Sequence, residues 1–169
     1  MLRHRLDALG LDVRVRSAGL LDNGHPAHSN SIDVLTGLGL DITDHRSRRI
    51  TAAILRSADL VVAMAREHVR EAVVMAPDVF PRAFTLKELV RRGEAVGPRA
   101  SGEKVADWLH RVHAGRTSSD LMGISDVDDV PDPIGLPRSA YERMVEELEE
   151  YLGRLVSLLW APSHERSYR

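Results

Sequence analysis

An acidic loop at residues 126–137 has the side chains best suited to chemistry. It concentrates four aspartates ahead of a helical pattern. Asp132 lies between Pro131 and Pro133, and a proline on each side restricts its backbone, so that the carboxylate is held in a defined position. Such a group can transfer a proton or bind a cation. On composition alone, a solvated surface turn is the more common interpretation of a loop of this kind.

Histidines are the second set of candidate groups. His45 lies in a run of mixed charge at residues 44–49, where basic groups could meet an anion or the acidic loop, although a surface turn is again the alternative. Two histidine pairs could share a metal, but neither has a third ligand at a convincing spacing. These pairs are His25 with His28, and His110 with His113. No glycine-rich phosphate loop follows a predicted strand. We therefore predict no metal and no cofactor.

Composition excludes several classes of site. The 169 residues contain no cysteine, which removes disulfides, thiolate metal sites and any mechanism with a thiolate nucleophile. The 23 basic and 25 acidic residues nearly cancel, so no face is suited to nucleic acid or an acidic membrane. No apolar run approaches the ~20 residues that span a bilayer, and the first residues resemble a helix rather than a signal peptide. We expect a cytoplasmic protein.

The candidate groups must be positioned by helices and strands, and the sequence predicts that these alternate along the chain. Alternating apolar and polar residues at 13–19 predict a half-exposed edge strand. The unbroken apolar run at 58–64 predicts a strand buried on both faces of a parallel sheet. Apolar periodicity or capping residues predict a strand at 83–86 and helices at 2–9, from Ser29 or Asn30, from Thr51, at 67–75 and at 141–159. The fold class is therefore α/β, with ligands expected at the carboxyl ends of the strands.

Length and hydrophobic content indicate one domain over residues 1–169. The chain is close to the usual size of a domain, and 43% of its residues are hydrophobic, enough for a core. Residues 87–125 fit less well, because glycines and a proline interrupt the helical pattern there. The interrupting residues are Gly93, Gly97, Pro98, Gly102 and Gly115. We predict that this segment, at about 87–125, is an insertion over the edge of the sheet.

Four motifs, taken in order, resemble the low-molecular-weight protein tyrosine phosphatase family. They are Ser17-Ala18-Gly19, Gly39-Leu40-Asp41 with Asp44-His45-Arg46-Ser47-Arg48, Ala58-Asp59-Leu60-Val61-Val62-Ala63-Met64 with His68, and Asp132-Pro133-Ile134-Gly135. The resemblance extends from Leu2 to about Leu159. It implies a three-layer sandwich in which a small parallel sheet of four strands lies between helices.

The resemblance also implies that part of the family's machinery is missing. In that family a cysteine in an N-terminal loop attacks phosphorus, while the loop's amides and an arginine hold the phosphoryl oxygens. That loop and the family's first strand precede the helix that corresponds to residues 2–9, so roughly twenty residues are expected to be absent here. We predict that the chain as given is inactive. Because the absent strand would be internal to the sheet, we also expect the chain alone to be unstable or prone to aggregate.

Two candidate residues gain roles from the resemblance. Asp132 would be the general acid, protonating a phenolate leaving group whose conjugate acid has a pKa of ~10. His45 would support the phosphate loop by hydrogen bonding. The implied partners are phosphorylated proteins or small aryl phosphates. Ile134 stands where the family usually has an aromatic residue, which leaves the preference for phosphotyrosine open.

Three other interpretations remain open at this stage. The chain could be a non-catalytic relative that acts as a binding or regulatory module. It could be related to arsenate reductases of the same fold, although these use several cysteines as a redox relay and this chain has none. Outside the family, the acidic loop could hold a divalent cation in a hydrolase or glycosyl transferase.

Overall fold

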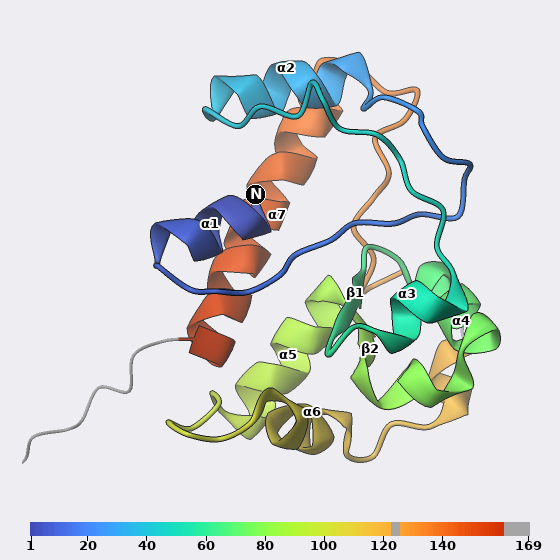
Figure 1. Ribbon diagram of the computed structural model, residues 1–169, viewed down its shortest axis with the longest axis vertical. Coiled ribbons are helices and arrows are strands. Elements are labelled where there is room, and N and C mark those ends of the chain that lie inside the picture. Colours follow the sequence, from blue (N-terminus) through green and yellow to red (C-terminus); the bar gives the residue numbers. More distant parts are fainter. Residues whose placement is uncertain (123–125, 161–169) are drawn as a thin grey trace, which may run out of the picture.

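The computed structural model describes residues 1–122 and 126–160 (Figure 1). Its sheet has two parallel strands, β1 (Val61–Ala63) and β2 (Ala83–Thr85), which pair Val61 with Ala83 and Ala63 with Thr85. The helices are α1 (Leu2–Ala8), α2 (Ser29–Gly37), α3 (Ala52–Arg56), α4 (Arg66–Met75), α5 (Leu86–Val96), α6 (Val105–His113) and α7 (Arg138–Trp160), with 3-10 helices η1 (Pro77–Arg82) and η2 (Ser118–Leu121). The predicted small parallel sheet flanked by helices is confirmed.

Helices cover both faces of the sheet, but β1, which forms within the apolar run at 58–64, is half-buried and not fully buried as predicted. Phe84 packs into a core formed with α5, α6 and α7, and Val62 lies against the same cluster. Ala83 packs into a second core with α3, α4 and η1, and Val61 borders that cluster. Successive strand residues point to opposite faces, so this alternation places one layer of helices on each side of the sheet.

The two strands differ in burial. All three residues of β2 are buried, whereas all three residues of β1 are only half-buried. Within the described residues, β1 pairs with β2 alone. In the part of the chain that the structure describes, one edge of β1 therefore has no strand beside it.

The predicted edge strand at 13–19 is not formed. Half-buried and exposed residues still alternate over residues 11–16, but these residues belong to no ladder. Gly19, at the end of the predicted strand, forms an isolated parallel bridge with Arg49. A strand needs a hydrogen-bonded neighbour, and the four strands that the resemblance implies are reduced to two in the part of the chain described.

Side-chain caps begin several helices. Thr51 Oγ1 accepts a hydrogen bond of 3.2 Å from the N–H of Ile54 at the start of α3, as predicted. The cap of α2 is His28, which precedes the predicted Ser29 by one residue and Asn30 by two, and its Nδ1 accepts a hydrogen bond from the N–H of Asn30 at 3.3 Å. An imidazole nitrogen there accepts the capping hydrogen bond that a serine or asparagine side-chain oxygen usually accepts.

Residues 87–122 are more regular than the glycine pattern predicts. Gly93 does not interrupt a helix, because it lies buried in the middle of α5. Gly97, with a positive φ of 84°, ends that helix. The role of this segment as an insertion stays a prediction. None of the helices in the described ranges has the length and apolar character needed to cross a bilayer.

Candidate active site at the carboxyl end of the sheet

The acidic loop passes over the carboxyl end of β1. The backbone N–H of Val130 donates a hydrogen bond of 2.7 Å to the carbonyl of Met64, the residue directly after β1. From there the loop runs up to the start of α7 (Figure 1). Because ligands of open α/β sheets bind outside the carboxyl ends of the strands, this position is the one expected for a functional loop.

Asp132 lies in this loop with its carboxylate exposed. Its Oδ1 accepts a hydrogen bond of 2.9 Å from the N–H of Ile134, which forms a local turn. Pro133 is buried, whereas the side chain of Ile134 is 68% exposed. The turn and the flanking prolines hold the Asp132 backbone, while the carboxylate stays open to solvent.

His45 is also exposed, and it lies in a pair of loops that bind each other. The more connected residue is Ser47, whose N–H donates to the carbonyl of His25 at 2.8 Å and whose Oγ donates to that of Asp22 at 2.6 Å. Within the described ranges, the ring of His45 makes no hydrogen bond or ion pair with any side chain, and nothing links it to Asp132. The geometry therefore does not bring the two predicted site residues into contact.

One histidine of each predicted pair has a structural partner. The His28 ring stacks on Tyr141 with centroids 5.2 Å apart. The His113 ring meets Phe80 edge-on at 5.0 Å, and its pKa lies below the ordinary value of 6.5 because of burial first and the nearby guanidinium of Arg116 second. In residues 1–122 and 126–160, no three metal-binding side chains converge on one point.

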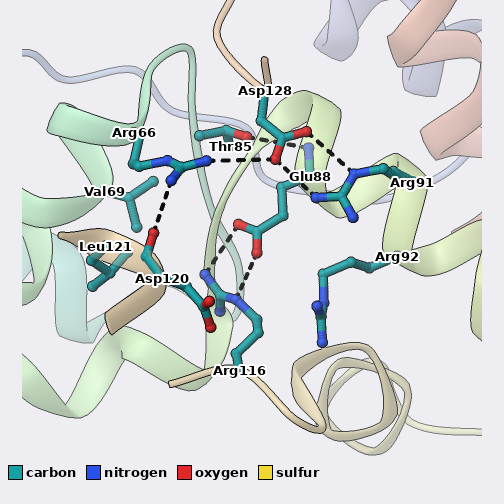
Figure 2. A pocket seen from close by; sticks show the side chains of 10 residues that line it. All are labelled: Arg66, Val69, Thr85, Glu88, Arg91, Arg92, Arg116, Asp120, Leu121 and Asp128. Atoms are coloured by element: carbon teal, nitrogen blue, oxygen red, sulfur yellow. Dashed lines mark hydrogen bonds and ion pairs between the residues drawn. The ribbon is translucent and has the colours of Figure 1, made fainter. Parts of the chain in front are cut away.

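A cavity of about 220 Å³ lies beside the acidic loop, between η2, α4 and α5 (Figure 2). Its charged lining consists of Arg66, Arg91, Arg92, Arg116, Glu88, Asp120 and Asp128. Ion pairs join opposite charges of this lining, among them Arg116 with Glu88 and Arg91 with Asp128, whereas Arg92 donates to backbone carbonyls. Sequence reasoning missed this cluster, since its members are distant in the chain and no motif joins them.

Arg116 and Glu88 form the most buried ion pair of this cavity. Arg116 Nε donates to Glu88 Oε1 at 2.8 Å, and its Nη2 donates to Glu88 Oε2 at 3.2 Å. The guanidinium also donates to the carbonyls of Phe80 and Ala83, and it lies 3.9 Å from the ring centroid of Phe84. Burial lowers the pKa of Arg116, although Glu88 opposes this shift. With so many partners, this arginine stabilises the fold and has little capacity for a ligand.

Asp128 makes the second ion pair and belongs to the acidic loop. It accepts two hydrogen bonds from Arg91, at 3.3 Å from Nε and 2.8 Å from Nη2. Arg66 Nη2 lies 3.9 Å from the same carboxylate, on its other side (Figure 2). The hydrogen bond to Asp128 raises the pKa of Arg91. The loop is thus bound to α5 and to the start of α4 as well as to β1.

Comparisons with known proteins identify the family of the chain. A model of the low molecular weight phosphotyrosine protein phosphatase family matches residues 1–97. The low molecular weight protein-tyrosine-phosphatase Etp of Escherichia coli K12 is 32% identical over 113 residues, which are 65% of this chain and 72% of Etp.

Solved structures agree with this match. The low molecular weight protein tyrosine phosphatase from T. tengcongensis superposes with a TM-score of 0.67 at 30% identity, covering 92% of this chain and 84% of that one. The YwlE arginine phosphatase from Geobacillus stearothermophilus gives a TM-score of 0.63 at 25% identity, covering 90% and 78%. More than half of the chain matches the family model, and the fold agrees with solved members. The chain belongs to the low molecular weight protein tyrosine phosphatase family.

Proposed function

We propose that the acidic loop supplies the proton donor of a phosphomonoesterase site, with Asp132 as general acid and His45 in support of the phosphate loop. The observation that carries the proposal is the hydrogen bond from Val130 to Met64, which holds the loop at the carboxyl end of β1. Asp132 follows two residues later and is exposed, so a substrate can reach its carboxyl group.

The proposed substrates are phosphorylated proteins or small aryl phosphates. Expulsion of a phenolate is aided by a donated proton, since the conjugate acid has a pKa of ~10, and general acid catalysis typically contributes ~10²–10⁴ in rate. The exposed Ile134 beside Asp132 can contact one side of a substrate, but it lacks the π-face with which an aromatic residue stacks on a phenyl ring. A cytoplasmic location belongs to the same proposal and is tested by fractionating cells that express the tagged chain.

The 169-residue chain by itself is proposed to be inactive as a phosphatase. A cysteinyl-phosphate intermediate needs a thiolate, and the chain has no cysteine. Purified chain, verified by mass spectrometry, is incubated with p-nitrophenyl phosphate, with Etp as the positive control. We expect no release of p-nitrophenol above that of buffer and no phosphorylated adduct in the intact mass. Turnover at a rate similar to that of Etp would overturn this part of the proposal.

The role of Asp132 is tested in a chimera that joins the first strand and phosphate loop of Etp to this chain. Asp132→Asn removes the proton donor and should slow phenyl phosphate, with its poor leaving group, more than p-nitrophenyl phosphate. Asp126→Asn is the matched control, because Asp126 is exposed in the same loop. Equal slowing of both substrates by Asp132→Asn would refute the assignment.

A further inference from the structure

We propose that Asp128 and Arg91 form a latch that positions Asp132, an inference that rests on the proposed role of Asp132 as general acid. Asp128 lies four residues before Asp132, and Arg91 lies on α5, outside the loop. Closing this ion pair ties the loop to α5. We call these two side chains the Asp128 latch.

Burial sets Asp128 apart from the other carboxylates of the loop. Asp126 and Asp132 are exposed and Asp129 is half-buried, but the Asp128 side chain is only 9% exposed. A buried carboxylate is strongly unfavourable unless a partner neutralises it and satisfies its oxygens. The loop conformation that buries Asp128 is therefore stable only while its guanidinium partners are present.

Arg91 is the partner with the geometry to hold the loop. It approaches Asp128 with Nε and Nη2 together, and such paired hydrogen bonds fix orientation as well as distance. Arg66 comes no closer than 3.9 Å, so its contribution is a weaker charge interaction. The Arg91 side chain is 60% exposed, and so its removal opens no void in the core.

Asp129 and Val130, the next two residues, bind the loop to a different part of the structure from α5. Asp129 Oδ1 accepts a hydrogen bond of 2.8 Å from the N–H of Arg66, the first residue of α4, and Val130 bonds to Met64. Both contacts join the loop to the β1–α4 connection. The Asp128 latch adds α5 as a second support, and two supports on different elements restrict the loop more than one does.

A spin label on the loop tests the latch in the chain as it exists. Because the chain has no cysteine, Ile134→Cys creates a single thiol, two residues from Asp132 and 68% exposed in its native form. A nitroxide attached there reports loop mobility by electron paramagnetic resonance. Asp128→Asn and Arg91→Gln are each expected to increase the label's mobility, and Arg91→Lys, which keeps the charge, should restore part of the order.

A matched control comes from the same helix. Glu94→Gln breaks the pair between Glu94 of α5 and Arg154 of α7, whose two hydrogen bonds are both 2.8 Å, and should leave the label unchanged. The double variant Asp128→Asn with Arg91→Gln should be no more mobile than either single variant. Far-ultraviolet circular dichroism checks folding, and should Asp128→Asn fail to fold, the exposed Arg91→Gln still decides the matter.

Two results would overturn the latch: a label as immobile in folded Arg91→Gln as in the parent, or a label released equally by Glu94→Gln. These measurements need no turnover. Failure of the latch therefore leaves the role of Asp132 to the leaving-group test on the chimera, and failure of that test leaves the label measurements interpretable.

Discussion

Gly93 of α5 lies directly against the indole of Trp108 of α6. A Cβ at Gly93 would lie 2.9 Å from Trp108 Cζ2 and 2.9 Å from Leu158 Cδ1, closer than real Cβ atoms approach. Trp108 is fully buried in the core, so its side chain cannot move aside without disturbing its neighbours. The absent side chain thus lets α5, α6 and α7 meet in one core.

Gly93→Ala is therefore expected to destabilise the protein, although alanine is the better helix former by about 1 kcal/mol. Overpacking of a tight core costs about 1–3 kcal/mol, so the net loss in the free energy of unfolding should be about 1 kcal/mol, measured by urea denaturation. Gly153→Ala on α7 is the control, since its nearest contact is the flexible end of Arg5 at 3.3 Å. An equal gain in stability for both variants would contradict the packing argument.

Arg116 is expected to be irreplaceable by lysine. Lysine keeps the charge but lacks the planar fork that binds both oxygens of Glu88 and two backbone carbonyls. Arg116→Met leaves Glu88 unpaired and should cost about 3–5 kcal/mol, and Arg116→Lys should recover less than half of that loss. Arg138→Lys, in an exposed pair with Glu142, should change the unfolding free energy by less than about 1 kcal/mol. Recovery of parental stability by Arg116→Lys would show that charge alone suffices.

His113 should make stability depend on pH in a defined direction. Its pKa in the folded protein lies below 6.5, because burial and the charges of Arg116, Arg92 and His110 disfavour the imidazolium. The unfolded chain then binds more protons, so the stabilising contribution is complete above pH 6.5 and is lost as pH falls through the folded pKa.

The check is urea denaturation at several pH values between about 7 and 5, the range in which histidine titrates. His113→Gln should flatten the decrease in stability, whereas His4→Gln on the exposed face of α1 should not. An unchanged slope in His113→Gln would contradict the assigned direction.

Tyr141 has a buried hydroxyl without a hydrogen-bond partner among the described residues. Removing an unsatisfied polar group from the interior is favourable, so Tyr141→Phe should raise the free energy of unfolding by up to about 1 kcal/mol. Tyr141→Leu should lower it, because the ring that stacks on His28 is lost. A destabilised Tyr141→Phe variant would mean that the hydroxyl has a partner.

Local patterns predicted the elements that depend on their own residues. The apolar stripe of α7 follows from periodicity, and the position of β1 follows from the apolar run at 58–64. The predicted strand at 13–19 is wrong because a strand also depends on a neighbour, which no local pattern reports. Gly93 was misinterpreted for a similar reason, since its small size serves contacts with α6 and α7 that are distant in the chain.

The candidate site also has features that local sequence predicts and features that it does not. The prolines on both sides of Asp132 indicate from the sequence alone that its backbone is constrained. The sequence does not indicate which of the four loop aspartates is buried, because burial of Asp128 depends on Arg91, which lies 37 residues earlier in the chain. The roles of Asp132 and His45 stay predictions.

Burial is distributed unevenly along the chain, and this has a consequence for motion. Among the first 50 residues only Leu6 and Val34 are buried, and the loops around Ser47 rest mainly on hydrogen bonds near solvent. Such regions open locally at low free-energy cost, while the cores around β2 open only with the whole domain. Amide protons of residues 11–28 and 38–50 should accordingly exchange with solvent long before those of α5. His45 thus lies in a segment that can open locally while the cores around β2 stay folded.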